Sequence, residues 1–434
     1  MNKQVIGKLT ALKQLKAAYL QQMFPQAEEK VPRVRFEGFS GEWVKVSLGE
    51  IADITSGITG DASISNGDYK LTRIETISNG AVDMARLGFT NNKPDSRYKL
   101  NQGDILYSNI NSIEHIGKVA IFQEQKDVYH GINLLRMSPV SVSPYFLYTY
   151  FLTQQVIDWA KSRANKAVSQ ASINQTALSG QLFYVPTRDE QKTIGNFFRT
   201  LDELIALHQR KLDALKNLKK TYLQRMFVAT KDSEKTLQNT ETSIVTGANR
   251  ELQNVPELRF DGFTEPWTQQ KLGEVAELSS SKRIHVSDYV SEGIPFYRGS
   301  EVSTGGVSQN DLFISQESYN DIKEKYGVPT KGDLLITAVG TLGNLWKVDD
   351  RQFYYKDGNL IRLGDLSAEA DYLIAYFSNG QGKKKILDSA EGSSQKALTM
   401  VKLNGVAFYV PDKPEQAAIG TFFRNLDELI KLYS

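Results

Sequence analysis

The chain contains 434 residues, 40% of them hydrophobic and 24% charged, with a formal net charge of +2. Its length predicts more than one hydrophobic core, its composition is ordinary for a globular protein, and so small a net charge does not by itself indicate a nucleic-acid-binding protein. The lack of cysteine excludes disulfides and thiolate metal sites, and with no long apolar run or signal peptide we expect a soluble cytoplasmic protein without a membrane partner.

The chain begins with a basic segment. Residues 1–24 carry four lysines and no acidic residue, and residues 206–227 carry six basic side chains against one aspartate. Charge alone is explained most simply by solvated helix faces. The two segments are also related, because Lys8–Phe24 matches Lys211–Phe227 at 12 of 17 positions. We therefore interpret residues 1–24 as a copy of part of a later helix.

A globular domain is predicted over residues 32–187. It opens on Pro-Arg-Val-Arg-Phe-Glu-Gly-Phe and continues to Trp43, a natural core anchor because tryptophan buries a large apolar area. Short β-rich runs followed by an amphipathic stretch predict a mixed α and β fold. These expected strands and the expected helix lie at residues 104–107, 118–122 and 145–162.

A long amphipathic helix is predicted over residues 188–227. Apolar residues recur there in steps of three and four without an internal proline. At ~1.5 Å per residue, the stretch Glu190–Phe227 would span ~57 Å. Thirteen residues of its first half recur at a constant offset of 225, up to Leu432. The second copy stops at Ser434, and residues 1–24 supply its missing continuation. Residues 413–434 and 1–24 therefore predict one interrupted helical region that pairs antiparallel with the central helix.

A polar join and a second globular domain complete the chain. Residues 228–255 are rich in Thr, Ser and Asn and aperiodic, which predicts a flexible linker. Residues 256–412 repeat the opening markers, including Trp267, at an offset of 224. Beyond these markers and a Gly-Asp-Ile-Leu or Gly-Asp-Leu-Leu signature, the two domains have diverged. The expected strands and helix lie at residues 333–337, 358–363 and 370–387.

The sequence contains no recognisable catalytic motif. It lacks a phosphate-binding P-loop, a dinucleotide fingerprint, a His-Glu-x-x-His segment and the Asn/Asp-Pro-Pro-aromatic motif of amino-methyltransferases. The four histidines form no recognisable ligand pair. We therefore assign no catalytic and no metal-ligating residue, and we expect a recognition protein or a scaffold rather than an enzyme.

The repeated segments resemble the specificity subunits of type I restriction–modification systems. The resemblance rests on Tyr-Val-Pro followed by Glu-Gln-x-x-Ile-Gly-x-Phe-Phe, which spans residues 184–198 and again 409–423. It implies an α+β chain in which two α/β target recognition domains are separated by two long antiparallel coiled-coil-like helical regions, in a pseudo-twofold circular repeat. The expected boundaries are 1–24, 32–187, 188–227, 228–255, 256–412 and 413–434.

The same resemblance implies a subunit that performs no chemistry itself. Each recognition domain would read one half of a split, asymmetric site in double-stranded DNA, and the helix length would fix the unread gap. Two methyltransferase subunits would dock on the helices and bring S-adenosylmethionine. Restriction and translocase subunits, which use ATP and Mg, would complete the restriction enzyme. No cofactor is then expected on this chain.

The helical spine supplies the candidate methyltransferase interface. Its candidate positions are apolar or aromatic and recur in both copies of the repeat. They are Ile194, Phe198, Leu201, Ile205, Ile419, Phe423, Leu426, Ile430, Leu12, Leu15, Tyr19, Leu215, Leu218 and Tyr222.

Candidate DNA contacts are basic and polar side chains in predicted loops. Lys and Arg bind phosphates, and Asn and Gln can make paired hydrogen bonds to adenine. Gln170 and Gln395 each follow a serine at the constant offset of 225, which a shared structural turn and a DNA contact explain equally well. In the first domain the candidates are Lys161, Arg163, Lys166, Ser169, Gln170, Arg73, Asn109 and Asn111. In the second domain they are Lys383, Lys384, Ser393, Ser394, Gln395, Lys396, Arg298 and Thr341.

Two other functions fit the sequence less well. A two-lobed scaffold that binds proteins but not DNA would use the same spine. A self-sufficient nuclease would need the pattern formed by Pro94-Asp95 and Glu124-Gln125-Lys126, which has no counterpart in the second half. Such loose spacing arises easily by chance.

Overall fold

A computed structural model describes residues 6–26, 29–61, 63–78, 80–166, 170–228, 254–307, 312–392 and 396–434. The chain divides into two compact units, one formed by Met1–Arg210 with Ser434 and the other by Lys211–Tyr433. Most of the predicted linker at 228–255 lies outside the described residues. Within the described part, no helix is both long and apolar enough to cross a membrane.

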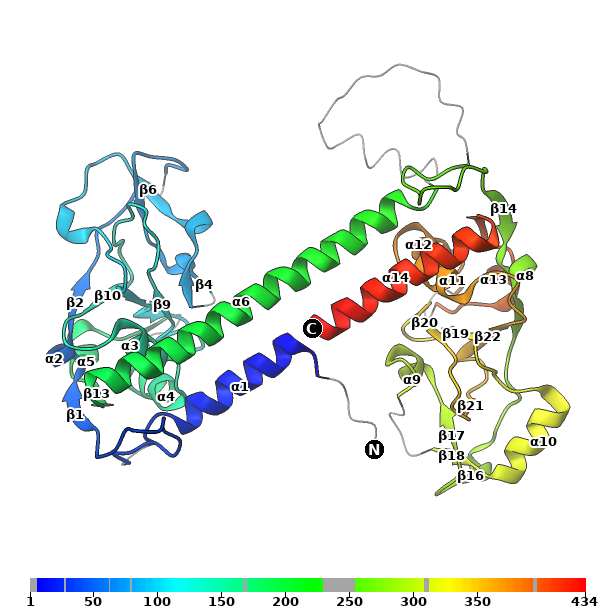
Figure 1. Cartoon of the computed structure of the whole chain (residues 1–434), viewed down its shortest axis with the longest axis horizontal. Coiled ribbons are helices and arrows are strands. Elements are labelled where there is room, and N and C mark those ends of the chain that lie inside the picture. The colour runs from blue at the N-terminus through cyan, green and yellow to red at the C-terminus, as the bar shows by residue number, and fades with distance from the viewer. Residues whose placement is uncertain are drawn as a thin grey trace, which may run out of the picture. The chain divides into compact units, whose positions relative to one another are not determined.

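In the first unit, helix α1 (Lys8–Gln22) packs antiparallel against the start of helix α6 (Arg188–Arg225) (Figure 1). Lys16 Nζ lies 2.5 Å from Asp202 Oδ1. The ring centroids of Tyr19 and Phe197 are 5.1 Å apart and meet edge to face. From the first contact to the second, the residue number rises on α1 and falls on α6, so the two helices run antiparallel. Helix α6 is continuous over 38 residues, as the sequence predicted.

In the second unit, helix α14 (Lys413–Tyr433) packs against the end of α6 in the same way. Lys219 Nζ lies 2.5 Å from Asp427 Oδ1, and the rings of Tyr222 and Phe422 meet at 5.0 Å. These four residues stand at the repeat positions of the first unit's ion pair and ring pair. The duplicated helix pair of the predicted circular repeat is therefore present at the level of individual contacts.

The C-terminal carbonyl also occupies the place that the circular repeat predicts. Ser434 belongs to the first unit, where its carbonyl accepts hydrogen bonds from Thr10 N at 3.2 Å and Thr10 Oγ1 at 2.7 Å. An amide in the first turn of a helix lacks a partner within its own helix. The last residue of the chain thus supplies an acceptor to the start of α1.

The first globular domain is built on a six-stranded sheet in the order β2-β10-β7-β9-β5-β4. All neighbours are antiparallel except β5 and β9. A separate pair, β1 with β13, joins the two ends of the domain beside the helices. The strands are β1 (Val44–Ser47), β2 (Ala52–Ser56), β3 (Tyr69–Leu71), β4 (Ile77–Ser78), β5 (Ala81–Val82), β6 (Gly88–Thr90), β7 (Ile105–Tyr107), β9 (Val119–Ile121), β10 (Leu135–Pro139) and β13 (Leu182–Val185), and the helices are α2 (Leu48–Ile51), α3 (Pro144–Phe151), α4 (Gln154–Arg163) and α5 (Gln175–Ser179).

The second globular domain keeps the same frame with a different interior. Its main sheet has the order β15-β22-β19-β20, and a second sheet has the order β16-β18-β17-β21. The strands are β14 (Thr268–Lys271), β15 (Glu277–Ser279), β16 (Tyr289–Val290), β17 (Ile294–Tyr297), β18 (Phe313–Ile314), β19 (Leu334–Thr337), β20 (Leu345–Lys347), β21 (Tyr354–Tyr355), β22 (Leu360–Gly364) and β23 (Ala407–Val410), and the helices are α8 (Leu272–Val275), α9 (Gly299–Ser303), α10 (Gln316–Tyr326), α11 (Ala370–Phe377), α12 (Gly380–Asp388) and α13 (Met400–Asn404).

Each helix expected after the central strands is two helices in the structure. The stretch at 145–162 breaks before Thr153, whose hydroxyl bonds back to the Tyr150 carbonyl at 2.8 Å while its backbone is extended. The stretch at 370–387 breaks at Asn379 and at Gly380, which has a φ of 54°. Periodicity continues across both breaks, so it could not reveal them. The four strands expected in the two domains are confirmed at β7, β9, β19 and β22.

A buried ion pair attaches each globular domain to its helix. In the first unit, Arg35 donates two hydrogen bonds to Glu190, at 2.6 and 2.7 Å, and the Glu190 side chain is fully buried. In the second unit, Arg259 makes the same paired contact with Glu415 at 2.8 and 2.6 Å. The indole of Trp267 also donates to Glu415 at 3.0 Å. We call these two sites the first and the second joint.

The rest of the repeated motif completes each joint. In the first joint, Gln191 accepts from the backbone amide of Ser143, which caps α3, at 2.9 Å. Gly195 brings α6 so close to α3 that an added Cβ would lie 3.0 Å from the amide nitrogen of Phe146. Phe24 and Trp43 are both buried there, as the sequence predicted for the tryptophan. Gln416 and Gly420 have the same roles in the second joint.

Removing the arginine of the second joint tests its energetic weight. Arg259→Ala leaves the Glu415 carboxylate, which is 1% exposed, without its counter-ion. We expect the free energy of unfolding of this unit to fall by about 3–5 kcal/mol, measured by urea denaturation with tryptophan fluorescence. In the control Lys331→Ala, which removes the exposed pair with Asp350, the loss stays below about 1 kcal/mol. Equal losses in the two variants would contradict this role.

Candidate nucleic-acid interface

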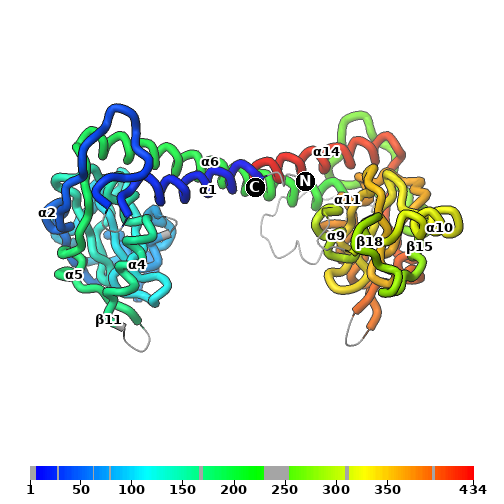
Figure 2. Tube along the Cα trace, turned by 90° about the horizontal axis from the view of Figure 1, so that it is seen from below, coloured from blue at the N-terminus to red at the C-terminus, as the bar shows by residue number. Residues whose placement is uncertain are grey.

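In the first unit, the candidate residues converge on a small sheet with the order β11-β12-β8. Its strands are β11 (Asn165–Lys166), β12 (Ala171–Ser172) and β8 (Ile110–Asn111). Ala171 lies between Asn111 on one side and Lys166 on the other. Figure 2 shows β11 at one end of the unit, away from the helices α1 and α6. Candidates more than 50 residues apart in sequence are thus neighbours on one surface, which the sequence did not predict.

The candidate side chains on this surface differ in whether they are hydrogen-bonded within the protein or exposed to solvent. Asn111 Nδ2 donates to Ser108 Oγ at 3.0 Å, and Asn109 Nδ2 donates to the Ile173 carbonyl at 3.3 Å. Asn109 Oδ1 is buried and accepts no hydrogen bond from the described residues. Arg163 and Gln170 are exposed, and Lys161 is half-buried at the end of α4. Ser169 and the side chain of Lys166 lie outside the described part of the chain.

In the second unit, the loop between β19 and β20 occupies the corresponding place. Lys383 Nζ donates to the carbonyls of Leu342, at 3.0 Å, and of Gly343, and it also contacts Asn344 Oδ1. Burial lowers the pKa of Lys383. The next residue, Lys384, is exposed. Of the two candidate lysines, Lys383 therefore holds the loop, and Lys384 presents its charge to solvent.

An antiparallel backbone pairing lies beside this loop. Glu391 and Ala397 exchange backbone hydrogen bonds at 2.9 and 2.8 Å, and Leu398 N donates to the Ala338 carbonyl at 2.9 Å. Lys396 is exposed at this pairing. In the first unit, β11 and β12 pair antiparallel on either side of the segment that contains Ser169. A shared structural turn at the Ser-Gln position stays a prediction. Contact of this turn with DNA stays a prediction, and Ser393, Ser394 and Gln395 lie outside the described residues.

Arg73 and Arg298 have similar local settings. They are 225 residues apart, each follows a strand, and each begins a short helix, η1 (Ile74–Thr76) or α9. An added Cβ on Gly299 would lie 3.8 Å from Thr337, so Arg298 belongs near the loop that carries the exposed residue Thr341. Arg73 is also exposed, but it donates to the Arg86 carbonyl at 3.4 Å. Among the described residues, no hydrogen bond or ion pair joins it to the sheet of β8 and β12.

The spine candidates separate into buried and accessible residues. Ile194, Phe198 and Leu201 are buried beside the first joint, and Ile419, Phe423 and Leu426 are buried beside the second. The accessible or half-buried candidates are Leu12, Leu15, Tyr19, Ile205, Leu215, Leu218, Tyr222 and Ile430. The sequence analysis missed a set of exposed leucines within the repeat itself. They are Leu204 and Leu207 on α6 and their counterparts Leu429 and Leu432 on α14.

No group of three or more His, Cys, Asp or Glu side chains among the described residues is arranged to hold a metal ion. The residues of the weak nuclease pattern serve local structure or face solvent. Asp95 caps the short helix η3 (Ser96–Tyr98) by accepting from Arg97 N at 2.9 Å. Glu124 and Lys126 are exposed.

The described residues form two diverged globular domains, each joined by a buried ion pair to a copy of the repeated helix. The sequence matches the family described as type I restriction modification DNA specificity domain over residues 40–217 and 264–433. The chain therefore belongs to this family, whose members are generally non-catalytic and assemble with other restriction–modification subunits and with DNA.

Individual relatives agree with this assignment. A putative type I restriction enzyme MjaX specificity subunit from Methanocaldococcus jannaschii is 27% identical over 423 residues, covering 93% of this chain and 91% of the relative. A putative type I restriction enzyme specificity subunit from Haemophilus influenzae is 38% identical over 160 residues, 37% of this chain and 40% of the relative. The S subunit of a type I system from M. genitalium has the same fold, with a TM-score of 0.58, 15% identity and coverage of 92% and 93% of the two chains.

The adjacent lysines of α12 provide a matched pair of variants. Lys383→Met removes the donor to the Leu342 and Gly343 carbonyls, and we expect the free energy of unfolding to fall by about 1–3 kcal/mol. Lys384→Met changes an exposed residue, and we expect a loss below about 0.5 kcal/mol. Urea denaturation measures both. A larger loss for Lys384→Met than for Lys383→Met would contradict the division between them.

Proposed function

We propose that this chain is the DNA-reading subunit of a type I restriction–modification complex. Each globular domain reads one half of a bipartite, asymmetric site in double-stranded DNA. Two methyltransferase subunits dock on the helices and methylate adenine at N6. With restriction and translocase subunits, the same complex cleaves DNA that lacks the methyl groups. S-adenosylmethionine, ATP and Mg bind to those partner subunits, and the complex works in the cytoplasm.

One observation supports the reading role: both units present a loop beside an antiparallel backbone pairing, with different side chains on each. The first surface offers Arg163, Gln170 and two asparagines, and the second offers Lys384, Lys396 and Thr341. Basic groups bind phosphates wherever they lie, whereas amide and hydroxyl groups discriminate base edges. A common frame with different polar groups suits two domains that read different half-sites.

The small net charge of the chain is compatible with this function. Basic side chains gather locally at the end of α4 and along α12, where Arg163 and Lys384 face solvent. Among the described residues neither of them makes an ion pair, so both charges remain available for phosphates. Binding of this kind depends on the local field and weakens as salt rises.

The docking role is supported by the exposed leucines of the repeated helix segments. Leu207 is 52% exposed and Leu432 is 41% exposed, and they occupy equivalent repeat positions. Exposed apolar residues at matched places on two helices suit two copies of one partner. Because α6 is unbroken, we also propose that its length sets the gap between the half-sites.

Methylation mapping tests this function directly. The chain is co-expressed with the methyltransferase subunit encoded beside it, and N6-methyladenine is mapped across the host genome. We expect a methylated motif of two short parts separated by a fixed gap, absent when either chain is expressed alone. A protein-binding scaffold would give no such motif. An active methyltransferase that yields no two-part motif would overturn the proposal.

A further inference from the structure

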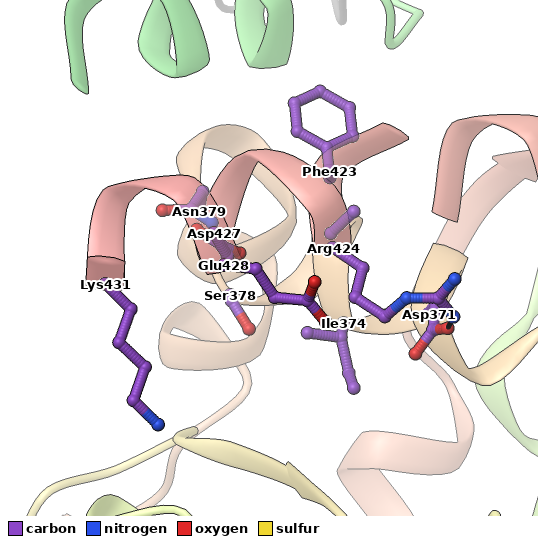
Figure 3. A pocket seen from close by; sticks show the side chains of 10 residues that line it. Asp371, Ile374, Ser378, Asn379, Phe423, Arg424, Asp427, Glu428 and Lys431 are labelled. Carbon is purple, nitrogen blue, oxygen red and sulfur yellow. Dashed lines mark hydrogen bonds and ion pairs between the residues drawn. The ribbon is translucent and has the colours of Figure 1, made fainter. Parts of the chain in front are cut away.

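The second unit contains a groove of about 270 Å³ between α11 and α14 (Figure 3). Ile374, Ala375 and Phe423 contribute its apolar lining, and the charged residues Asp427 and Glu428 stand over it. The groove is smaller than the roughly 300–1,000 Å³ of a typical small-molecule site. It suits one large side chain better than a cofactor.

The first unit fills the equivalent place with its own side chains. Helix α3 corresponds to α11 at an offset of 226, so Tyr148 stands where the second unit has Ile374, and Tyr145 stands where it has Asp371. The two tyrosine rings meet edge to face at 5.2 Å, and Tyr148 is only 4% exposed. Burial, together with the negative charge of Asp202, raises the pKa of Tyr148. The tyrosines therefore cover the face of α6 that bears this aspartate.

Asp202 in the first unit and Asp427 in the second differ in their hydrogen-bond partners. Asp202 binds Lys16 through Oδ1 and accepts from the Tyr145 hydroxyl through Oδ2 at 3.1 Å. Its counterpart Asp427 binds Lys219 through Oδ1 but has no partner for Oδ2 among the described residues. The Asp427 side chain is 49% exposed, against 23% for Asp202. In the first unit, Asp202 Oδ2 is therefore occupied by the Tyr145 hydroxyl. In the second unit, Asp427 Oδ2 is left as an open hydrogen-bond acceptor in the groove.

We propose that this groove receives an aromatic side chain, a tyrosine, from the methyltransferase subunit that docks on α14. The copy that docks on the first unit binds without this anchor, because Tyr148 already fills the equivalent place there. The ring of the inserted tyrosine would rest on Ile374 and Ala375, and its hydroxyl would donate to Asp427 Oδ2, as Tyr145 donates to Asp202. This inference rests on the proposed docking function. Aromatic side chains inserted into small pockets are common anchors of protein interfaces.

The surroundings of the groove favour a protein over nucleic acid. Two cations line it: Arg424, which is already paired with Asp371 at 2.6 Å, and Lys431. The carboxylates of Asp371, Asp427 and Glu428 outnumber them. Phosphates would therefore find no excess of positive charge here. The exposed residues Leu429 and Leu432 lie on the same turns of α14, so a partner that covers them would reach the groove.

Filling the groove from within tests the proposal. Ile374→Tyr copies the first unit, and we expect the full chain to bind the methyltransferase subunit at least about tenfold more weakly in isothermal titration calorimetry. Ile374→Val, which leaves the groove open, should bind within about threefold of the unchanged chain. Unchanged affinity of a folded Ile374→Tyr chain would overturn the proposal.

A second variant covers the case in which a tyrosine at position 374 prevents folding. Ser378→Leu copies Leu152 of the first unit at the groove's edge, and we expect it also to weaken binding about tenfold. Glu324→Leu adds a leucine on exposed α10 and serves as its control. Equal affinities of these two variants would count against the groove. Failure of the unchanged chain to bind the methyltransferase would instead overturn the docking function itself.

A photo-crosslink identifies the occupant. A benzophenone amino acid placed at position 378 of the full chain is irradiated in the assembled complex, and the crosslinked peptide is identified by mass spectrometry. We expect a methyltransferase peptide that contains a tyrosine. A crosslink to DNA, or to a peptide without an aromatic residue, would contradict the proposed occupant.

Discussion

The buried arginine–glutamate pair of each joint is the interaction on which the rest of its unit depends. Glu190 lies in the first turn of α6, where the helix dipole favours a negative charge, and Arg35 comes from the segment that follows α1. The same guanidinium also donates to the carbonyls of Ser40 and Gly41, close to Trp43. One arginine therefore holds together the start of α6, the segment that follows α1 and the backbone that leads to Trp43. Because both charges are withdrawn from water, removing either partner leaves a buried unpaired charge and lowers the free energy of unfolding.

The repeated residues near this pair have structural tasks, which frees the rest of each domain to vary. Asp104 and Asp333, from the Gly-Asp signatures, accept from backbone amides at 2.8 and 2.7 Å and stabilise the same turn. Their preceding glycines have φ values of 93° and 98°, which only glycine adopts readily. The loops after β7 and β19 begin a few residues later and share little sequence. Variation at the loops can thus change the exposed surface without disturbing the frame.

The sequence predicted the long helices of the repeat, the four central strands and the circular relation of the two termini, but it predicted one helix where each domain has two. The features predicted correctly come from periodicity and exact repetition, which depend on local spacing. The joints were missed, although Arg35, Glu190 and their counterparts were all in the repeated segments, because pairing across more than 150 positions leaves no periodic signal. For the same reason, the sequence could not place Asn109 beside β12 or show that Lys383 is used internally.

Repetition also concealed a difference between the two units. The helix segments around Asp202 and Asp427 are nearly identical, yet tyrosines cover one and the other is open. The cause lies in α3 and α11, where the aligned residues differ in size. A repeat identifies what two units share, and only their packing shows where they differ.

The central claim is that each domain reads its half-site independently on a common frame. Replacing residues 264–412 with the corresponding segment of another specificity subunit, and mapping N6-methyladenine in cells that also carry the methyltransferase, tests it most directly. We expect one half of the methylated motif to change while the other half and the gap stay the same. A change in both halves would contradict independent reading.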